Sequence, residues 1–355
     1  MKKLNLAVIG QGRSGKNIHG LYFESESNTL FNVKYVVDAD EKRRELAKAT
    51  YNCEVFADYK ELFDKDDIDL VVNASFSEMH YSITKDLLMH KKNVLVEKPM
   101  GRNRYECEDL IKTAKENNVL LTVFHQSLVA PYYLKAKEII AEGLIGEPKV
   151  INLRYNGLAR RWDWQTLQKK LAGSVYNTGP HPLGLAMDLL GFGEDVKVVY
   201  SYLDCALTSG DGEDIAKIIV TAPNKPVVDI EINSTDPYSD YTLKVQGTKG
   251  TIKCTQKKII GKYIVDGENP EKPVIEEFLR DEDNKPIYCK ENLITHEIEE
   301  EITGSVFIEA TATIYENIYA ALTEGKELIV KPENIARLVG LIEKIHADNP
   351  LPLKY

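Results

Sequence analysis

A histidine between two prolines is the residue whose setting most suggests chemistry. In the stretch SVYNTGPHPLG (174–184), His181 lies between Pro180 and Pro182, four residues after Asn177. An imidazole has an unperturbed pKa of about 6.5, so it can take or give a proton near neutral pH. Proline is tolerated in a first helical turn, and the two prolines would fix the direction of the ring. A helix start whose apolar residues simply pack inward also explains the stretch.

A glycine-rich turn near the start of the chain has the composition of a phosphate-binding loop. The residues GQGRSG (10–15) follow the apolar run LNLAVI and precede a predicted helix. Glycines allow a tight turn and close backbone approach to a pyrophosphate, and a helix N terminus offers unpaired N–H groups. A glycine turn without a ligand is the alternative. The predicted cofactor contacts in this turn are Gly10, Gln11, Gly12, Arg13, Ser14 and Gly15.

The same turn fits two classes of nucleotide. Residues 10–16 also match the triphosphate-binding loop G-x-x-x-x-G-K, but Asn17 stands where Ser or Thr would bind magnesium. A dinucleotide site instead needs an acid after the second strand to bind ribose hydroxyls. Asp38 ends the strand-like run VKYVVD, 23 positions after Gly15. The context therefore favours a dinucleotide.

Asp38 also indicates which dinucleotide to expect. A carboxylate pairs with a ribose 2′-hydroxyl and repels a 2′-phosphate, which favours NAD over NADP. Arg43 and Arg44 follow closely, so NADP stays open. A simple turn that Asp38 begins with Asp40 is the structural alternative.

Hydrophobic periodicity predicts the elements that position these residues. In the first 125 residues, apolar β-branched runs alternate with charged, helix-like segments. Continuous apolar runs flanked by helices are typical of a parallel sheet buried on both faces. We therefore predict a doubly wound α/β domain of Rossmann type over residues 1–125. The strand-like runs are 4–10, 33–38, 70–75, 93–99 and 120–126, with a weaker one at 53–56.

The pattern changes after about Gln126. One helix is predicted over 131–146, and strand-like segments then follow one another without helices between them. This predicts a large, mostly antiparallel sheet. We assign residues 126–355 to a second, α+β domain for substrate binding and oligomerisation, with C-terminal helices over 305–346. The strand-like segments are 149–156, 196–204, 215–222, 227–235, 241–247, 251–255 and 258–265.

Polar residues gather where the predicted parallel strands end. Ligands of a doubly wound sheet bind outside these carboxyl ends, so such residues can face one crevice as cofactor contacts. A lysine there can have its pKa lowered by burial or can orient a hydroxyl oxygen. A surface pair of Lys98 with Glu97, and a His80 that only packs, are the alternatives. The strand-end residues are Ser75, Ser77, His80, Glu97, Lys98 and His125.

Segment 58–100 resembles the glucose-fructose oxidoreductase / inositol dehydrogenase / MocA family. The similarity comprises D-Y-x-x-L at Asp58, the acids Asp67 and Asp69, the small-residue turn 75–80 ending in histidine, and Glu97-Lys98-Pro99. It extends over nearly all of the first 125 residues. The resemblance implies an NAD(P)-dependent oxidoreductase acting on a hydroxyl or ketone of a sugar, sugar derivative or cyclitol, and it assigns Glu97 to a ribose hydroxyl.

The family's second domain carries D-x-x-x-H with a further acid three residues on. Here His181 is kept, but Asn177 stands at the first acid position and Gly184 at the second. An asparagine cannot be a base, although its amide can bind a substrate hydroxyl or fix an imidazole tautomer. Some group must take the hydroxyl proton when an alcohol is oxidised. We expect His181 to do so, with Lys98 assisting.

Both tryptophans of the chain lie just before this segment. Trp162 and Trp164 flank Asp163 and follow Arg161. Aromatic faces beside hydrogen-bonding side chains suit a polyol or sugar; an interface or lid loop is the alternative. The predicted substrate contacts are Lys98, Arg161, Trp162, Trp164, Asn177 and His181.

Composition narrows the class of partner. With 355 residues and a formal charge of -10, the chain is not expected to bind nucleic acid or an anionic membrane. Its five scattered cysteines suggest a reducing cytoplasm and no metal site. We expect a homodimer or homotetramer that covers the second sheet. Glycoside cleavage assisted by retained NAD and a non-catalytic NAD sensor are alternative functions.

Overall fold

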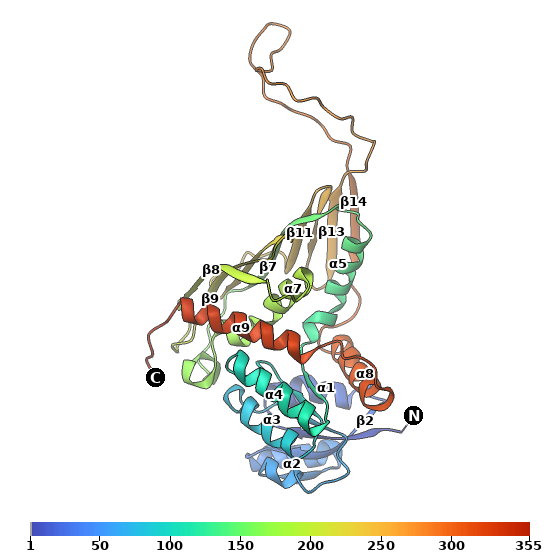
Figure 1. The fold of residues 1–355 in the computed structure, drawn as a ribbon, viewed down its shortest axis with the longest axis vertical. Helices are drawn as coiled ribbons and strands as arrows, with labels where there is room; N and C mark the ends of the chain where they lie inside the picture. The colour runs from blue at the N-terminus through green and yellow to red at the C-terminus, as the bar shows by residue number, and fades with distance from the viewer. Residues whose placement is uncertain (1) are drawn as a thin grey trace.

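Six parallel strands form the first of two sheets in the computed structural model, which describes residues 2–355 (Figure 1). Their order is β3-β2-β1-β4-β5-β6, which confirms the predicted doubly wound fold. The chain reverses direction across the sheet between β1 and β4, and loops that diverge at such a point leave a crevice. The strands are β1 (Leu4–Ile9), β2 (Phe31–Val37), β3 (Glu54–Phe56), β4 (Leu70–Asn73), β5 (Val94–Val96) and β6 (Leu121–Val123).

Side-chain caps mark the starts of some of the helices that connect these strands. Asp40 accepts a hydrogen bond from Arg43 N at the start of α2, and Asn103 caps α4 in the same way. Asn52 ends α2 in the left-handed conformation, which asparagine tolerates. The helical segments are η1 (Gly15–Gly20), α1 (Leu21–Glu24), α2 (Glu41–Tyr51), η2 (Tyr59–Leu62), η3 (Ser77–Met79), α3 (His80–Met89) and α4 (Arg104–Asn117).

The second sheet has eight strands in the order β14-β13-β12-β11-β7-β10-β9-β8. Among the described strands of this second sheet, only β7 and β10 pair in parallel, so the predicted, mostly antiparallel sheet is confirmed. The sequence pattern does not predict β14 (His296–Glu301), because HEIEEE is acidic and forms an exposed edge. The others are β7 (Pro148–Asn156), β8 (Lys197–Asp204), β9 (Ile215–Thr221), β10 (Val227–Asn233), β11 (Leu243–Gly247), β12 (Gly250–Cys254) and β13 (Lys258–Tyr263).

The two C-terminal helices return to the first sheet. Figure 1 shows α9 between the two sheets and α8 beside α1 and β2. Tyr315 of α8 stacks on Tyr22, with ring centroids 4.8 Å apart, and the Tyr319 hydroxyl donates to Lys2 O. The predicted boundary at residue 125 stays a prediction, since part of the C-terminal segment packs against the N-terminal half. The helices of this half are α5 (Pro131–Ala141), α6 (Ser174–Asn177), α7 (Pro180–Leu190), α8 (Glu309–Glu324) and α9 (Pro332–Asp348).

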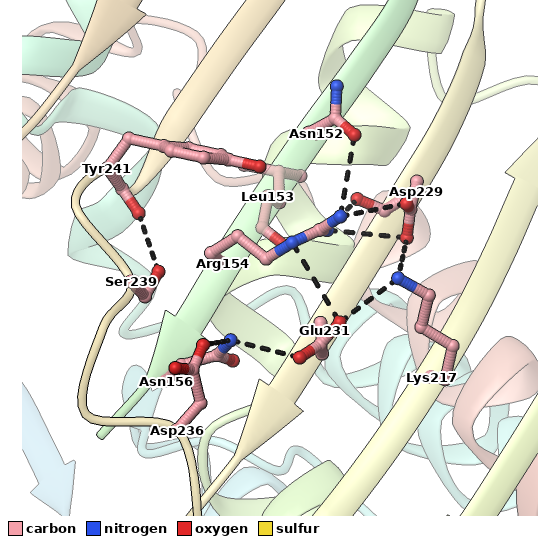
Figure 2. Close-up of polar contacts among 10 residues, drawn as sticks. All are labelled: Asn152, Leu153, Arg154, Asn156, Lys217, Asp229, Glu231, Asp236, Ser239 and Tyr241. Atoms are coloured by element: carbon pink, nitrogen blue, oxygen red, sulfur yellow. Dashed lines mark hydrogen bonds and ion pairs between the residues drawn. The ribbon is translucent and has the colours of Figure 1, made fainter. Parts of the chain in front are cut away.

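The open face of the second sheet carries a network of paired charges (Figure 2). Arg154 of β7 and Lys217 of β9 each lie 2.8 Å from an oxygen of Asp229 on β10, and Lys217 also reaches Glu231 at 3.1 Å. Charges that pair with one another tolerate contact with water. The predicted homo-oligomer that would cover this face stays a prediction.

A long loop extends from the second sheet between β13 and β14. Residues 264–295 form this loop, which extends far from the sheet in Figure 1. Val274 and Phe278 of the loop are exposed.

None of the helices within residues 2–355 combines the length and the apolar character needed to cross a membrane. All five cysteines are free thiols.

A partly buried ion pair anchors α9 to the segment before α7. Glu213 accepts from Val175 N at 2.8 Å and lies 3.3 Å from Nε2 of His346. The His346 ring stacks on Tyr176, with centroids 4.5 Å apart. Burial opposes the charged imidazole, but the hydrogen bond and charge of Glu213 outweigh it and raise the pKa of His346.

We predict that His346→Gln lowers stability in a pH-dependent way. Because the folded pKa lies above the unfolded value of about 6.5, the stabilisation is complete below that value and disappears as pH rises through the folded pKa. The melting temperature should fall by about 3 °C at pH 5.5, corresponding to roughly 1 kcal/mol, and should change little at pH 9. Thermal unfolding at both pH values measures this, and an equal loss at both would contradict it.

Candidate active site

A cleft of about 880 Å³ lies outside the carboxyl ends of the parallel strands. The first sheet and its loops form one side, and the segments around α6 and α7 form the other. Most of the residues predicted from the sequence line this one cleft. They are Gly10, Gly12, Arg13, Ser14, Asp38, Ser75, Ser77, His80, Glu97, Lys98, Arg161, Trp164, Asn177 and His181.

The glycine turn has the shape that a pyrophosphate requires. Gly10 has a φ of 89°, and a Cβ there would lie 2.4 Å from Ala74 O. A Cβ on Gly15 would lie 1.8 Å from Gly10 O, so this glycine lets the first helical turn pack on the loop, outside the cleft lining. Gly12 has no heavy atom within 4 Å of its Cβ position, which leaves the backbone open to a ligand. These features fit the predicted dinucleotide.

Asp38 is held in place at the end of β2. Its carboxylate accepts from Gln11 N at 2.7 Å and from Asp40 N at 2.9 Å. Gln11 therefore acts through its backbone, and it is absent from the cleft lining. The Arg43 guanidinium lies 3.7 Å from Asp38 and lines the cleft, whereas Arg44 donates to backbone oxygens. A fixed carboxylate here fits a ribose diol.

His80 connects two loops at the edge of the cleft. Its Nδ1 lies 2.7 Å from Pro99 O and its Nε2 lies 3.1 Å from Ser75 O. Burial lowers its pKa despite these two acceptors. The ring thus braces the Ser75 turn against the Glu-Lys-Pro segment.

Lys98 is partly buried where the two halves of the chain meet. Its Nζ donates to the backbone oxygen of Asn177. Burial lowers its pKa, Glu97 opposes this effect, and the charges of Arg13 and Arg161 reinforce it. The ammonium group is therefore easier to deprotonate than that of a surface lysine.

His181 is oriented by a residue that the sequence pattern does not single out. Ser127 Oγ lies 2.6 Å from its Nδ1, and the Tyr155 ring lies parallel to the imidazole. Burial, followed by the charges of Lys98 and His125, places the pKa of His181 well below its usual value. The imidazole is therefore neutral near pH 7, with its orientation fixed by Ser127.

The Asn177 side chain takes part in a series of hydrogen bonds that ends in an ion pair. Its Oδ1 accepts from Gln165 Nε2 at 3.1 Å, and Gln165 accepts in turn from Arg161. Arg161 also pairs with Asp163 at 2.8 Å. Gln165 lines the cleft and is not predicted from the sequence, because a glutamine in a loop carries no motif.

Besides Gln11 and Gly15, two more of the predicted site residues, Trp162 and His125, lie outside the cleft lining. Trp162 is 76% exposed, whereas Trp164 lines the cleft and packs edge-on against Phe76 at 5.1 Å. His125 is buried beneath α7, where its Nε2 lies 2.7 Å from Pro180 O. A loop beside a cleft can turn one tryptophan inward and its neighbour outward, which composition cannot distinguish.

Gln126 is a further cleft residue that sequence reasoning missed. It follows the last parallel strand, lines the cleft and is 6% exposed, yet its Oε1 has no hydrogen-bond partner. A buried amide oxygen normally has a partner. Its position one residue after His125, at a strand end, was the available signal.

Two family models match this chain. One, described as an oxidoreductase family with an NAD-binding Rossmann fold, matches residues 4–125. The other, the family's C-terminal alpha/beta domain, matches residues 137–345. The chain belongs to the glucose-fructose oxidoreductase / inositol dehydrogenase / MocA family. It is therefore an oxidoreductase with an NAD-binding domain, which confirms the resemblance noted in the sequence.

Relatives within this family differ in their named activities. A 2,7-anhydro-N-acetylneuraminate hydratase of Mediterraneibacter gnavus is 24% identical over 294 residues, covering 81% of this chain and 77% of the relative. An NADP(+)-linked scyllo-inositol 2-dehydrogenase of Bacillus subtilis is 26% identical over 190 residues, covering 53% and 52%.

Solved structures of similar fold cover nearly the whole chain. An NAD-binding protein from Listeria innocua has a TM-score of 0.78 at 22% identity, covering 98% of this chain and 96% of that one. A 3-ketoreductase from Actinomadura kijaniata, solved with NADP and TDP-benzene, has a TM-score of 0.78 at 16% identity and covers 98% of both chains. These similarities describe the fold that the family shares.

We predict that Asp38→Asn shifts the cofactor preference toward NADP(H). The variant removes the charge that repels a 2′-phosphate, while Arg43 remains to pair with one. The ratio of the Kd for NADPH to the Kd for NADH should fall about tenfold, as measured by fluorescence quenching. Glu41→Gln, an exposed charge loss in α2, is the matched control. An unchanged ratio in Asp38→Asn would contradict the role of this carboxylate.

We also predict that Gly184→Ala is destabilising. A Cβ there would lie 2.5 Å from the His125 ring, which its hydrogen bond to Pro180 holds in place. Such overpacking should cost about 2 kcal/mol, although alanine is the better helix former. Chemical unfolding measures the cost, with Gly157→Ala, whose Cβ meets no atom within 4 Å, as control. The cost should shrink in a His125→Ala background; equal costs in both backgrounds would refute the clash.

Proposed function

We propose that this chain transfers a hydride between NAD(P) and a secondary hydroxyl or ketone of a sugar, sugar derivative or cyclitol. The observation that carries the proposal is that Lys98, Asn177 and His181 line the same cleft as the glycine turn and Asp38. Bound NAD(P) supplies the acceptor or donor of the hydride. The protein has to bind the polyol, exclude water and handle the hydroxyl proton.

Lys98 and His181 are the groups proposed to handle that proton. Each is partly buried, and the charge of Lys98 lowers the pKa of His181 in addition to the larger effect of desolvation. A neutral imidazole held by Ser127 can accept the hydroxyl proton, and Lys98 can stabilise the oxygen that loses it. This retains His181 as the base with Lys98 assisting, although the depressed pKa makes His181 a weaker base than a free imidazole.

The remaining cleft residues are proposed to bind the polyol. Trp164 and Phe76 offer apolar faces to a sugar ring, and Arg161 with Gln165 offers hydrogen bonds to hydroxyl edges. Asn177 acts as an amide beside Lys98 and not as a base. The named activities of the scyllo-inositol dehydrogenase and the 3-ketoreductase support this class of substrate.

Redox-assisted cleavage of a glycoside on the same fold is the second candidate. Two relatives named as 2,7-anhydro-N-acetylneuraminate hydratases favour it. Such an enzyme would retain its cofactor and turn over without net NADH. A non-catalytic sensor would bind NAD and turn over no polyol, glycoside or cyclitol.

We predict that Lys98→Met and His181→Ala each lower kcat for polyol oxidation by about 100-fold, because each removes a proton-handling group. NADH formation across sugars, glycosides and cyclitols identifies the substrate and then measures the variants. Lys112→Met, at an exposed position on α4, is the control for losing a lysine.

The same panel separates the candidate functions. Full activity of His181→Ala would reject the assigned base. Glycoside consumption without net NADH would support the redox-assisted cleavage instead. NADH binding without turnover of any substrate would support the sensor.

A further inference from the structure

Glu97, a cleft residue, is the end of a buried hydrogen-bond chain that starts on α8. The Tyr315 hydroxyl lies 2.8 Å from Nδ1 of His19, and Nε2 of His19 lies 3.1 Å from Oε1 of Glu97. His19 and Tyr315 are both completely buried, and neither lines the cleft. The chain thus connects the cleft to a helix 296 positions away from His19 in sequence.

The protonation states at the two ends determine the direction of the chain. Burial raises the pKa of the Tyr315 phenol well above its usual value, so this hydroxyl keeps its proton and donates it. Burial would also raise the pKa of Glu97, but the hydrogen bond from His19 and nearby positive charge, including that of Lys98, outweigh it and lower the pKa. With a donor at one end and an ionised acceptor at the other, the hydrogen-bond geometry requires His19 to accept on Nδ1 and to donate from Nε2.

The second oxygen of Glu97 is held as well. It accepts from Lys98 N at 3.1 Å. Each carboxylate oxygen therefore has one internal donor and keeps further acceptor capacity. Because Glu97 lines the cleft, this capacity is available to a bound ligand.

Aromatic packing fixes the members of the chain from the sides. The Phe124 ring lies 4.4 Å from the His19 ring, and Tyr22 stacks on Tyr315 at 4.8 Å. Phe23 and Phe31 meet the Tyr315 ring at 5.1 Å and 5.4 Å. A packed apolar surround excludes water that could otherwise replace either hydrogen bond.

We propose that His19 and Tyr315 are positioning residues that hold Glu97 as an ionised, correctly directed acceptor for a ribose hydroxyl of the dinucleotide. Helix α8 is then part of the cofactor site, although it belongs to the C-terminal half of the chain. This inference uses only the cofactor-binding part of the proposed function. A protein that binds NADH normally but oxidises no polyol would refute the proposed reaction and leave the inference standing.

Two isosteric variants of His19 separate positioning from simple packing. In His19→Gln the amide nitrogen takes the place of Nε2, so the donor to Glu97 is kept. In His19→Asn the amide oxygen takes the place of Nδ1, so only the contact with Tyr315 is kept. We expect the Kd for NADH to rise about tenfold in His19→Asn and less than about threefold in His19→Gln. Equal affinities of the two variants for NADH would overturn the proposal.

A measurement on the unmodified chain tests the direction of the hydrogen bonds without relying on variant folding. Two-bond ¹H–¹⁵N correlations of histidine-labelled protein report the tautomer of each ring, and the signals that disappear in His19→Gln identify His19. We expect Nε2 to carry a proton and Nδ1 to carry none, and Tyr315→Phe should move the Nδ1 resonance while Nε2 stays protonated. A proton on Nδ1, alone or together with one on Nε2, would overturn the proposal, because Tyr315 could not then donate to it.

Discussion

The hydrogen bond from Lys98 to the backbone oxygen of Asn177 is the contact on which the site depends. A buried ammonium is costly unless it has acceptors, so Lys98 requires α6 to stay close to the end of β5. Its partner is a carbonyl dipole and not a carboxylate, and therefore the positive charge is solvated but not neutralised. One contact thus joins the two halves of the chain and sets the electrostatics of the cleft between them.

The groups around Lys98 are arranged as this uncompensated charge requires. His181 is neutral because desolvation and the nearby charge of Lys98 hold its pKa well below the usual value. Glu97, the nearest carboxylate in sequence, already lies within hydrogen-bond distance of His19, and the second half of the chain bonds the ammonium through the backbone oxygen of Asn177. Within residues 2–355, Lys98 has no carboxylate bonded to it, so a ligand with a polarised oxygen can serve as its partner. For this reason we assign proton handling to Lys98 and His181.

The fold and the cofactor half of the site could be predicted because parallel strands gather their carboxyl ends at one edge. That geometry brings Asp38, Ser75 and Lys98 together from three strands without knowledge of any side-chain contact. The substrate half is less predictable, because its residues lie on loops with no repeat period. Trp162 and Trp164 show the limit of such a prediction. They lie two positions apart in the sequence, yet Trp162 is exposed and Trp164 lines the cleft. Ser127, Gln165 and His19 were missed because each acts through a partner that is distant in the chain or has no motif.

The two departures from the family pattern have different physical consequences. At Gly184 the structure explains the missing acid: the His125 ring occupies the space that any side chain would need. At Asn177 the backbone contact with Lys98 would be available to either residue, so the change acts through charge. An aspartate there would stabilise the ammonium and raise its pKa, whereas the amide leaves burial as the dominant effect. In the proposed reaction, the substitution therefore leaves the exchange of the hydroxyl proton to Lys98 and His181.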